Sequence, residues 1–223
     1  MRIVITGANR GIGLALARVF SERGDEVHGT ARDPSSAKEL AALPSVEVHA
    51  LDVCSDESCA ALGRELGPLG AVDVLVNNAG IGRWEGLGDF DAKAALELFD
   101  TNAIGALRVT RALLPLLEKA RGKIFHMSSG MGSIEDNRSG GAYGYRMSKA
   151  ALGMAGRTLA VDLRPRGIAS IVIEPGWVQT DMGGPGATIT ADESARQLAA
   201  IIDARGLESS GKFFKRNNTE LAW

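Results

Sequence analysis

Seven short apolar runs recur along this chain at intervals. They are RIVIT (2–6), EVHGTA (26–31), VEVHA (46–50), VDVLVN (72–77), KIFHMS (123–128), IASIVIE (168–174) and KFFKR (212–216). Each is separated from the next by a segment long enough for a helix, which is the rhythm of a parallel sheet covered by helices on both faces. We therefore expect a single α/β domain over residues 1–223, with a doubly wound parallel sheet of seven strands.

Three helical stretches carry the rest of the pattern. The first follows the 2–6 strand and runs through 14–20. The third covers 143–164, and its small residues are suited to close helix packing: Gly153, Ala155, Gly156 and Ala160. The second covers 90–119 and has one stripe of Ala95, Leu98, Phe99, Asn102, Ala106, Val109 and Leu113. Asn102 is the polar residue on that stripe. A buried amide needs partners, so Asn102 is either a structural bracket or part of a site.

Composition narrows the class of protein. With 223 residues, 45% hydrophobic, the chain can bury one sizeable core. Its net charge of −2 and pI near 6.0 imply no basic patch for nucleic acid or an anionic membrane. No apolar run approaches a membrane span, and the run after Arg2 is too short for a signal peptide. We expect a cytoplasmic protein with no nucleic-acid or membrane partner.

No metal site is expected. Cys54 and Cys59 lack a nearby histidine or further cysteine, so they are interpreted as reduced structural thiols. His28, His49 and His126 lie in or beside strand-like runs, far apart in the sequence, and are assigned no chemistry.

The first strand-to-helix junction reads TGANRGIG, and its candidate ligand-binding residues are Thr6, Gly7, Asn9, Arg10, Gly11, Ile12 and Gly13. Glycines at such a turn let the backbone approach a pyrophosphate, whose charge is met by amide groups and the helix N-terminus. The spacing is GxxxGxG, which differs from the commoner GxGxxG. An ordinary glycine-rich turn is the alternative, and the junction alone indicates only a nucleotide.

The end of the second strand carries the residues that would decide between NAD and NADP. NAD-binding units place an acidic residue in this region, whereas NADP-binding units place an arginine nearby. Here the strand ends in Ala31 and Arg32, and Arg32 with Arg10 could grip a 2′-phosphate through charge-assisted bonds. Asp33 precedes Pro34 and is interpreted as the N-cap of the next helix. The pattern predicts NADPH or NADP.

Other polar segments end strands at the same predicted edge, where open α/β folds bind ligands. Asp52 could accept a hydrogen bond from an adenine amino group or cap the helix from Ser55 onward. NNAG (77–80) could brace the edge, SSGMGS (128–133) supplies hydroxyls, and PGWVQT (175–180) could meet a carboxamide through its backbone and the Thr180 hydroxyl, although Pro-Gly is also a plain turn.

Tyr145 and Lys149 lie four residues apart, on one face of the predicted helix. A cation about 4 Å from the phenol, at an effective dielectric of about 20, is worth roughly 4 kcal/mol. That would lower the tyrosine pKa by roughly three pH units, so the phenol could exchange a proton near neutral pH, as hydride transfer to or from a carbonyl requires. Tyr143 has Met147 at the same spacing. Tyr–Lys pairs at this spacing also occur on solvent-exposed helix faces. A catalytic role for this pair is therefore supported only by the other motifs.

Taken together, TGANRGIG, LDV (51–53), NNAG, Asn102, the serine pair and YRMSK followed by PGWVQT resemble the short-chain dehydrogenase/reductase family over essentially the whole chain. YGYRMSKAAL and PGWVQTDMGG look closest to its sniffer and C-factor branch of carbonyl reductases. The resemblance implies a Rossmann-fold sheet of order 3-2-1-4-5-6-7 and an NADPH-dependent oxidoreductase. It implies Tyr145 as general acid/base and Lys149 as the group that lowers the tyrosine pKa and holds the nicotinamide ribose. Ser129 would bind the substrate oxygen, and Asn102 would order a water linking Lys149 to solvent.

The motifs also imply which residues contact the cofactor. Besides Tyr145, Lys149 and the glycine loop, these are Arg32, Asp52, Val53, Asn78, Ala79, Gly80, Pro175, Gly176, Val178 and Thr180. The gap of 16 residues from Ser129 to Tyr145 is longer than in many members, which leaves Ser133 as a second candidate.

Apolar residues predicted near Tyr145 favour small to medium uncharged aldehydes or ketones: Trp84, Met131, Trp177 and Met182. Glycines 183, 184 and 186 would let a lid close over the bound aldehyde or ketone. The small residues of the two long helices favour a homodimer. Two alternatives remain: a regulator that binds NADP to sense redox state with little turnover, and a nucleotide-sugar epimerase, which needs a substrate domain that is not expected after Pro175.

Overall fold

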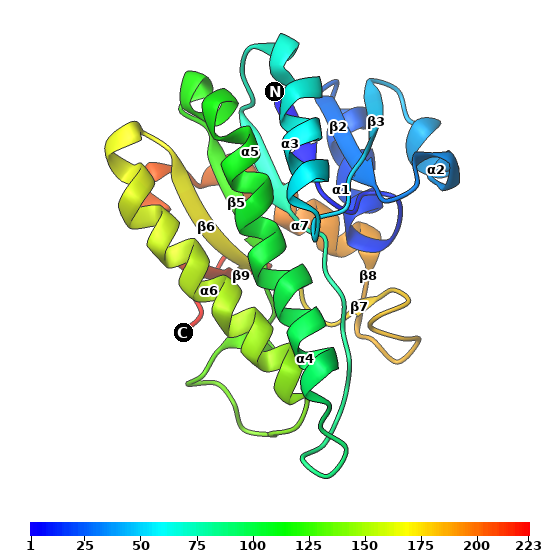
Figure 1. Ribbon diagram of the computed structural model, residues 1–223, viewed down its shortest axis with the longest axis vertical. Helices are drawn as coiled ribbons and strands as arrows, with labels where there is room; N and C mark the ends of the chain where they lie inside the picture. Colours follow the sequence, from blue (N-terminus) through cyan, green and yellow to red (C-terminus); the bar gives the residue numbers. More distant parts are fainter.

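A seven-stranded sheet forms the centre of the computed structural model, which describes residues 1–223 (Figure 1). Its order is β3-β2-β1-β4-β5-β6-β9, and every neighbouring pair is parallel. The strands are β1 (Arg2–Ile5), β2 (Glu26–Ala31), β3 (Val46–Ala50), β4 (Val74–Asn77), β5 (Lys123–Met127), β6 (Ala169–Glu174) and β9 (Phe213–Lys215). The predicted strand order is confirmed. The last strand is β9 only because a small parallel pair, β7 (Val178–Gln179) and β8 (Ile189–Thr190), precedes it.

Helices cover both faces of the sheet. In Figure 1, α3 (Asp56–Glu65), α5 (Gly105–Ala120) and α6 (Tyr143–Leu163) lie in front of it, and α1 (Gly11–Glu22) and α7 (Ala191–Ala204) lie behind; the short α2 (Lys38–Ala41) lies near β3. Strand side chains alternate between two cores. Ile3 and Ile5 belong to the core that includes α1 and α7, whereas Val4 belongs to the core that includes α3 and α5.

The second helical stretch differs from its prediction. Instead of one helix over 90–119, α4 (Ala92–Phe99) leads through a π-helical turn (Asp100–Ile104) into α5. The start is set by Asp91, whose carboxylate accepts hydrogen bonds from the amides of Lys93 and Ala94. The inserted turn contains Asn102, and such turns are frequent at functional sites.

Small residues of α6 pack within the chain. A Cβ on Gly156 would lie 2.7 Å from the Val172 side chain of β6, and one on Gly153 would lie 2.9 Å from Trp223. Ala160 is buried as well. Close packing was the sequence argument for a homodimer, but these residues serve the packing of α6 onto its own sheet and C-terminus.

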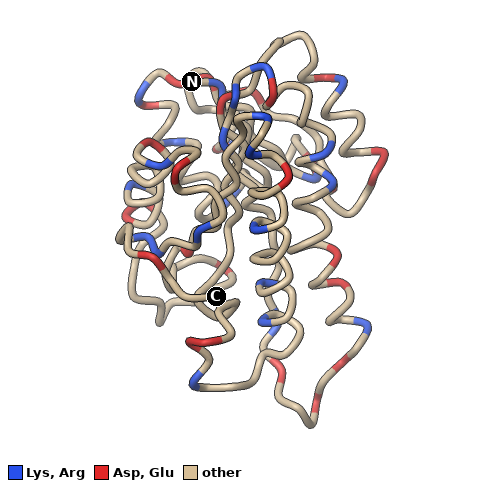
Figure 2. The backbone as a smooth tube through the Cα atoms, turned by 90° about the vertical axis from the view of Figure 1, so that its left-hand side faces the viewer, with Lys and Arg blue, Asp and Glu red and all other residues tan.

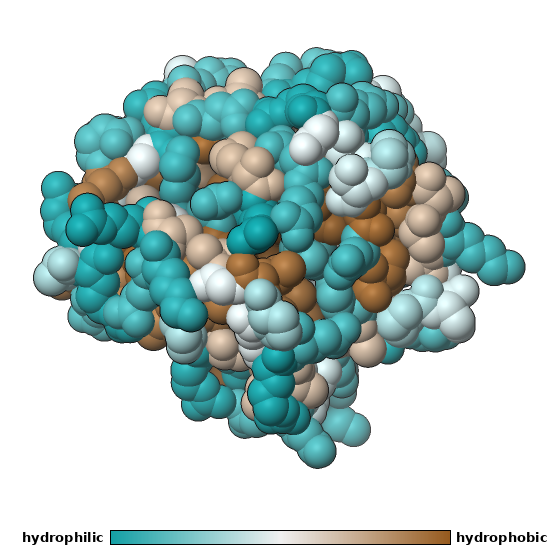
Figure 3. All heavy atoms as spheres, turned by 90° about the horizontal axis from the view of Figure 1, so that it is seen from above, coloured by the Kyte–Doolittle hydropathy of each residue, from teal (hydrophilic) through white to brown (hydrophobic).

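The carboxyl ends of the strands lie at the lower edge in Figure 1, together with the long connections that follow β4, β5 and β6. Seen from the opposite edge, the surface is mostly hydrophilic with separate hydrophobic patches (Figure 3). Basic and acidic residues alternate along the backbone in the side view (Figure 2), in keeping with the net charge of −2. None of the helices combines the length and the apolar character needed to cross a membrane.

Candidate active site

Hydrogen bonds between the ends of β1 and β4 fix the glycine loop. The buried Thr6 hydroxyl accepts hydrogen bonds from the amides of Asn78 (3.0 Å) and Ala79 (2.9 Å). In return, the Asn78 side-chain amide donates to the carbonyls of Thr6 (2.8 Å) and Gly7 (3.0 Å). The prediction that NNAG braces the sheet edge is confirmed.

The loop itself is shaped for close approach of an anion. Gly7 and Gly11 have φ of +62° and +56°, a region that favours glycine. The amides of Gly11, Ile12 and Gly13 form no hydrogen bond, and no side chain caps this helix N-terminus, where Arg10 is the N-cap and Asn9 precedes it. Uncapped amides at a helix start are suited to a phosphate group. The residues present therefore fit the pyrophosphate of a dinucleotide.

The two arginines of the predicted selector are placed differently. Arg32 is exposed just after β2 and forms no ion pair. Arg10 is paired with Asp181, from the segment after β7, at 2.7 Å. Both partners are exposed, and such pairs contribute only about 0 to 1 kcal/mol. Arg32 is thus the unengaged cation of the two, whereas one nitrogen of the Arg10 guanidinium is engaged by Asp181.

The neighbouring carboxylates have local partners. Asp33 accepts a hydrogen bond from the Ser35 amide at 2.9 Å, so the predicted N-cap is confirmed, although the helix it caps is a single 3₁₀ turn. Asp52 accepts from the Cys54 amide at 2.9 Å, and α3 is capped by Ser55 instead. Asp52 therefore stabilises the turn before α3 and keeps one carboxylate oxygen uncommitted. Val53 is buried beside it.

Tyr145 and Lys149 meet inside the protein, where their side chains are almost removed from solvent, at 6% and 5% exposure. The lysine Nζ lies 5.8 Å from the centroid of the phenol ring and donates a hydrogen bond to the Met127 carbonyl at 2.8 Å. Gly80 lies beside it, since a Cβ there would be 3.4 Å from Nζ. The structure thus places both residues at the carboxyl ends of β4 and β5.

Of the candidate serines, Ser129 is the one at the phenol. It follows β5, its hydroxyl accepts the Met131 amide at 3.2 Å, and it lies close enough to the Tyr145 hydroxyl to act to lower the tyrosine pKa. The Ser133 hydroxyl instead accepts from the Asp136 amide at 3.1 Å, within its own loop. Ser133 therefore has a local structural role, and the long loop leaves Ser129 as the hydroxyl beside Tyr145.

Burial dominates the electrostatics of the pair. It raises the pKa of Tyr145 above its ordinary value, an effect that the Ser129 hydroxyl opposes and the Glu174 carboxylate reinforces. Burial also lowers the pKa of Lys149 to about 8. The net lowering of the tyrosine pKa expected from the sequence is therefore not found in the protein alone, because desolvation of the phenolate dominates.

Asn102 is fully engaged as a bracket. Its carbonyl oxygen accepts from the Ile81 amide at 2.8 Å, and its amide group donates to the Ile81 carbonyl (3.0 Å) and the Ser148 hydroxyl (2.9 Å). Ser148 donates in turn to the Tyr145 carbonyl at 2.8 Å. Asn102 therefore ties the loop after β4 to the helix that carries Tyr145.

Apolar side chains cover the phenol. The Trp84 ring meets the Tyr145 ring edge-on at 4.9 Å between centroids, and Met131 packs on the same small cluster. Met182 lies beside Trp84 near Gly82. The Trp177 indole is farther out and donates to the Gly183 carbonyl at 2.8 Å, which holds the glycine-rich segment in a turn.

The segment after β6 reaches back to the glycine loop. Gly176 has φ of +88°, its amide donates to the Glu174 carboxylate at 2.8 Å, and the Pro175 carbonyl accepts from a buried serine of α7 at 2.7 Å. The methyl group of Thr180 lies 3.2 Å from the Cβ position of Gly11. Val178, buried in β7, anchors the stretch between these ends. The predicted cofactor residues from 175 to 180 therefore reach from the end of β6 to the glycine loop.

Two residues at the site were missed in the sequence. Glu85 is buried, accepts the Gly144 amide at 2.7 Å through one carboxylate oxygen, and accepts the Ala142 amide at 2.7 Å through its carbonyl. It fastens the loop after β4 to the start of α6, and nothing in its irregular sequence context indicates this. Glu174 had a signal, since an acid closing an otherwise apolar strand falls at the ligand-binding edge.

Comparisons with known proteins agree with this geometry. The family described as short chain dehydrogenase matches residues 1–188. C-signal of Myxococcus xanthus is 51% identical over 156 residues, covering 69% of this chain and 94% of that protein. Two solved structures superpose with a TM-score of 0.94 at 33% identity: the carbonyl reductase Sniffer of D. melanogaster (100% of this chain, 99% of that one) and the NADPH-bound carbonyl reductase from chicken fatty liver (100% and 98%).

The chain therefore belongs to the short chain dehydrogenase family. The family and branch predicted from its motifs are confirmed, and so is the fold.

The buried ammonium of Lys149 predicts how the free energy of unfolding changes with pH. Its pKa falls from 10.5 to about 8 on folding, which at about 1.4 kcal/mol per pH unit costs about 3 kcal/mol of stability. Because the unfolded chain binds this proton more tightly, the cost is fully present below pH 8 and disappears as the pH rises to 10.5. The free energy of unfolding of the wild type, relative to Lys149→Met, should rise by about 3 kcal/mol over that range.

Urea denaturation at several pH values measures this difference. Lys119→Met, at an exposed position of α5, is the matched control and should run parallel to the wild type. Parallel curves for Lys149→Met as well would contradict the assignment of a destabilised buried ammonium.

Proposed function

We propose that this protein is an NADPH-dependent oxidoreductase that reduces small to medium uncharged aldehydes or ketones, with Tyr145 as the general acid/base. The observation that carries the proposal is the burial of Tyr145 with Ser129 beside its hydroxyl and Lys149 close to its ring. The structural likeness to two carbonyl reductases supports it.

Each of these side chains has a role in reduction. NADPH, when bound, supplies the hydride that reaches the carbonyl carbon. The Ser129 hydroxyl donates a hydrogen bond to the substrate oxygen, and the Tyr145 hydroxyl gives it a proton as negative charge develops there. Burial raises the pKa of Tyr145, so the phenol is protonated at neutral pH and ready to act as an acid. The Lys149 ammonium stabilises the phenolate that remains.

The cofactor is proposed on two features of the chain. The unbonded amides at the start of α1 fit a pyrophosphate, and Arg32 at the end of β2 fits a 2′-phosphate. The likeness to the NADPH-bound reductase from chicken fatty liver supports the same choice. Lys149 would hold the nicotinamide ribose, and the backbone at residues 175–180 would meet the carboxamide.

A second candidate function is a regulator that binds NADP with little turnover. It is favoured by one observation, the 51% identity to a protein called C-signal. Measured turnover decides between the two. For either function we propose a cytoplasmic location.

The decisive variant is Tyr145→Phe. Loss of the proton donor should lower kcat by about 10²-fold or more, while the dissociation constant for NADPH stays within a few-fold of the wild type. Tyr143→Phe is the matched control, because Tyr143 lies on the same helix but is partly exposed and has no lysine partner. Greater damage from Tyr143→Phe would mean that the acid is misassigned, and a wild type that binds NADPH without turnover would favour the regulator.

Cofactor preference should depend on Arg32. One charge-assisted contact contributes about 1.5 to 3 kcal/mol, so Arg32→Ala should weaken NADPH binding by roughly tenfold to more than a hundredfold, with NADH binding unchanged. Arg64→Ala, at an exposed position of α3, is the control. Fluorescence titration of both cofactors measures the effect, and equal wild-type affinities for NADPH and NADH would rule it out.

The substrate prediction follows from Trp84 and its apolar neighbours. A hydrophobic wall discriminates weakly, at about 1 to 3 kcal/mol per methylene, so kcat/KM should vary gradually across apolar carbonyls and be lower for anionic and phosphorylated ones. Trp84→Ala should lower kcat/KM for the apolar members most. A single anionic substrate preferred by orders of magnitude, with apolar ketones inert, would show that the wall does not form the pocket.

We also propose a homodimer, on evidence other than the small residues. Met147, Met154 and Val161 are exposed apolar residues seven apart on α6, and Leu96 on the adjoining α4 is 70% exposed. A second copy would cover this stripe. Light scattering at micromolar concentration should give about twice 23.4 kDa for the wild type and a lower mass for Met154→Lys. A wild-type mass of 23.4 kDa would count against the dimer.

A further inference from the structure

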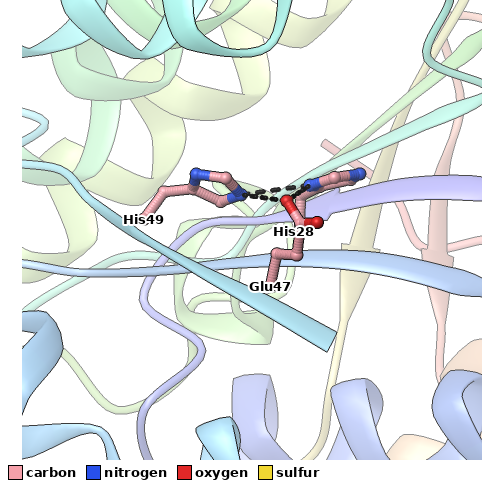
Figure 4. Close-up of side chains that lie close together, drawn as sticks. All are labelled: His28, Glu47 and His49. Atoms are coloured by element: carbon pink, nitrogen blue, oxygen red, sulfur yellow. Dashed lines mark hydrogen bonds and ion pairs between the residues drawn. The ribbon is translucent and has the colours of Figure 1, made fainter. Parts of the chain in front are cut away.

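Two histidines far apart in the sequence meet on the outer strands of the sheet. His28 of β2 is paired in register with Glu47 of β3, and His49 follows two residues later on the same face. Figure 4 shows the two rings pointing toward each other with the Glu47 carboxylate beside them. The ring nitrogens His28 Nδ1 and His49 Nε2 are 3.0 Å apart, and Glu47 Oε2 lies 3.7 and 3.9 Å from them.

The outer nitrogen of each ring faces another carboxylate. His28 Nε2 lies 3.3 Å from Glu26 Oε1, and His49 Nδ1 lies 2.7 Å from Glu65 Oε1 of α3. The result is a chain of three contacts: Glu26 to His28, His28 to His49, and His49 to Glu65. Rings held by a carboxylate at the outer nitrogen are typical of histidines that bind a metal at the inner one.

This series of three contacts lacks one proton. Each of the three contacts joins two lone pairs and needs a proton between them, but two neutral imidazoles carry only two protons. If both rings donate to their carboxylates, the inner lone pairs face each other at 3.0 Å. A cation between the inner nitrogens removes the conflict.

The distances suit a zinc ion. With Zn–N and Zn–O bonds of about 2.0 to 2.1 Å in a tetrahedron, ligand atoms lie about 3.4 Å apart. The observed separations of 3.0, 3.7 and 3.9 Å lie on both sides of that value, within about half an ångström. The Glu47 side chain is 73% exposed, so it can adjust and the ion can enter from solvent.

We propose that His28, Glu47 and His49 bind a zinc ion, with water as the fourth ligand and Glu26 and Glu65 orienting the rings. The site joins β2 and the edge strand β3 to α3 through Glu65, away from Tyr145. Its expected effect is on stability, because an ion that binds the folded chain and not the unfolded chain raises the free energy of unfolding.

The test uses the full chain without an affinity tag, freed of metal by a chelator. Calorimetric titration should show one Zn²⁺ per chain and a higher Tm, with no such effect of Mg²⁺, which prefers oxygen ligands. Co²⁺ should give the visible absorption of a tetrahedral site. Glu47→Gln, whose exposed side chain leaves the fold intact, should weaken Zn²⁺ binding at least tenfold, and Glu65→Gln by about tenfold to a hundredfold.

Two controls separate this site from incidental binding. Cys54→Ser removes the exposed thiol, the other group on the surface that attracts zinc, and should leave affinity unchanged. Glu39→Gln removes an exposed carboxylate from α2 and should also have no effect. The proposal is overturned if Zn²⁺ does not bind at micromolar concentration, or if binding survives Glu47→Gln and is lost in Cys54→Ser.

Discussion

Removal of the Tyr145 and Lys149 side chains from water is the constraint on which the rest of this structure depends. A buried ammonium and a buried phenol are costly to ionise, and their pKa values move in the directions that burial dictates. The same dry surroundings strengthen any interaction with charge that develops on a reacting oxygen. Under the proposed function, the loss of stability in the protein alone is exchanged for strong electrostatics during reaction, and the surrounding loops must hold the two side chains away from solvent.

Those loops are held by polar groups that are themselves buried. Thr6 and Asn78 link the ends of β1 and β4, Asn102 links the loop after β4 to α6, and Glu85 holds the first turn of α6. Each bracket joins segments distant in sequence, so the site forms only when the sheet has its final order. Of the two interpretations of Asn102, the structure shows the bracket, which ties Ile81 in the loop after β4 to Ser148 on the helix that carries Tyr145.

The sequence predicted what depends on local periodicity and missed what depends on long-range contacts. The strands follow from apolar runs, their order from the family resemblance, and the glycine loop from spacing. The sign of the Tyr145 pKa shift could not be predicted, because it depends on how completely α6 and Trp84 cover the phenol. Likewise Arg10 is engaged by Asp181, which is 171 residues away, and His28 meets His49 only because β2 and β3 pair in one register.

Strand register also explains why Ser129, and not the adjacent Ser128, lies beside the Tyr145 hydroxyl. Successive residues of an extended chain point to opposite sides, and Ser129 continues β5 with extended φ and ψ of −156° and 150°. Ser128 is buried and donates to the Lys149 carbonyl at 3.3 Å, which holds α6 against the sheet, while Ser129 faces Tyr145. A slip of one residue in β5 would exchange these roles. The parallel pairing of β5 with β4 and β6 therefore determines which of the two hydroxyls lies beside Tyr145.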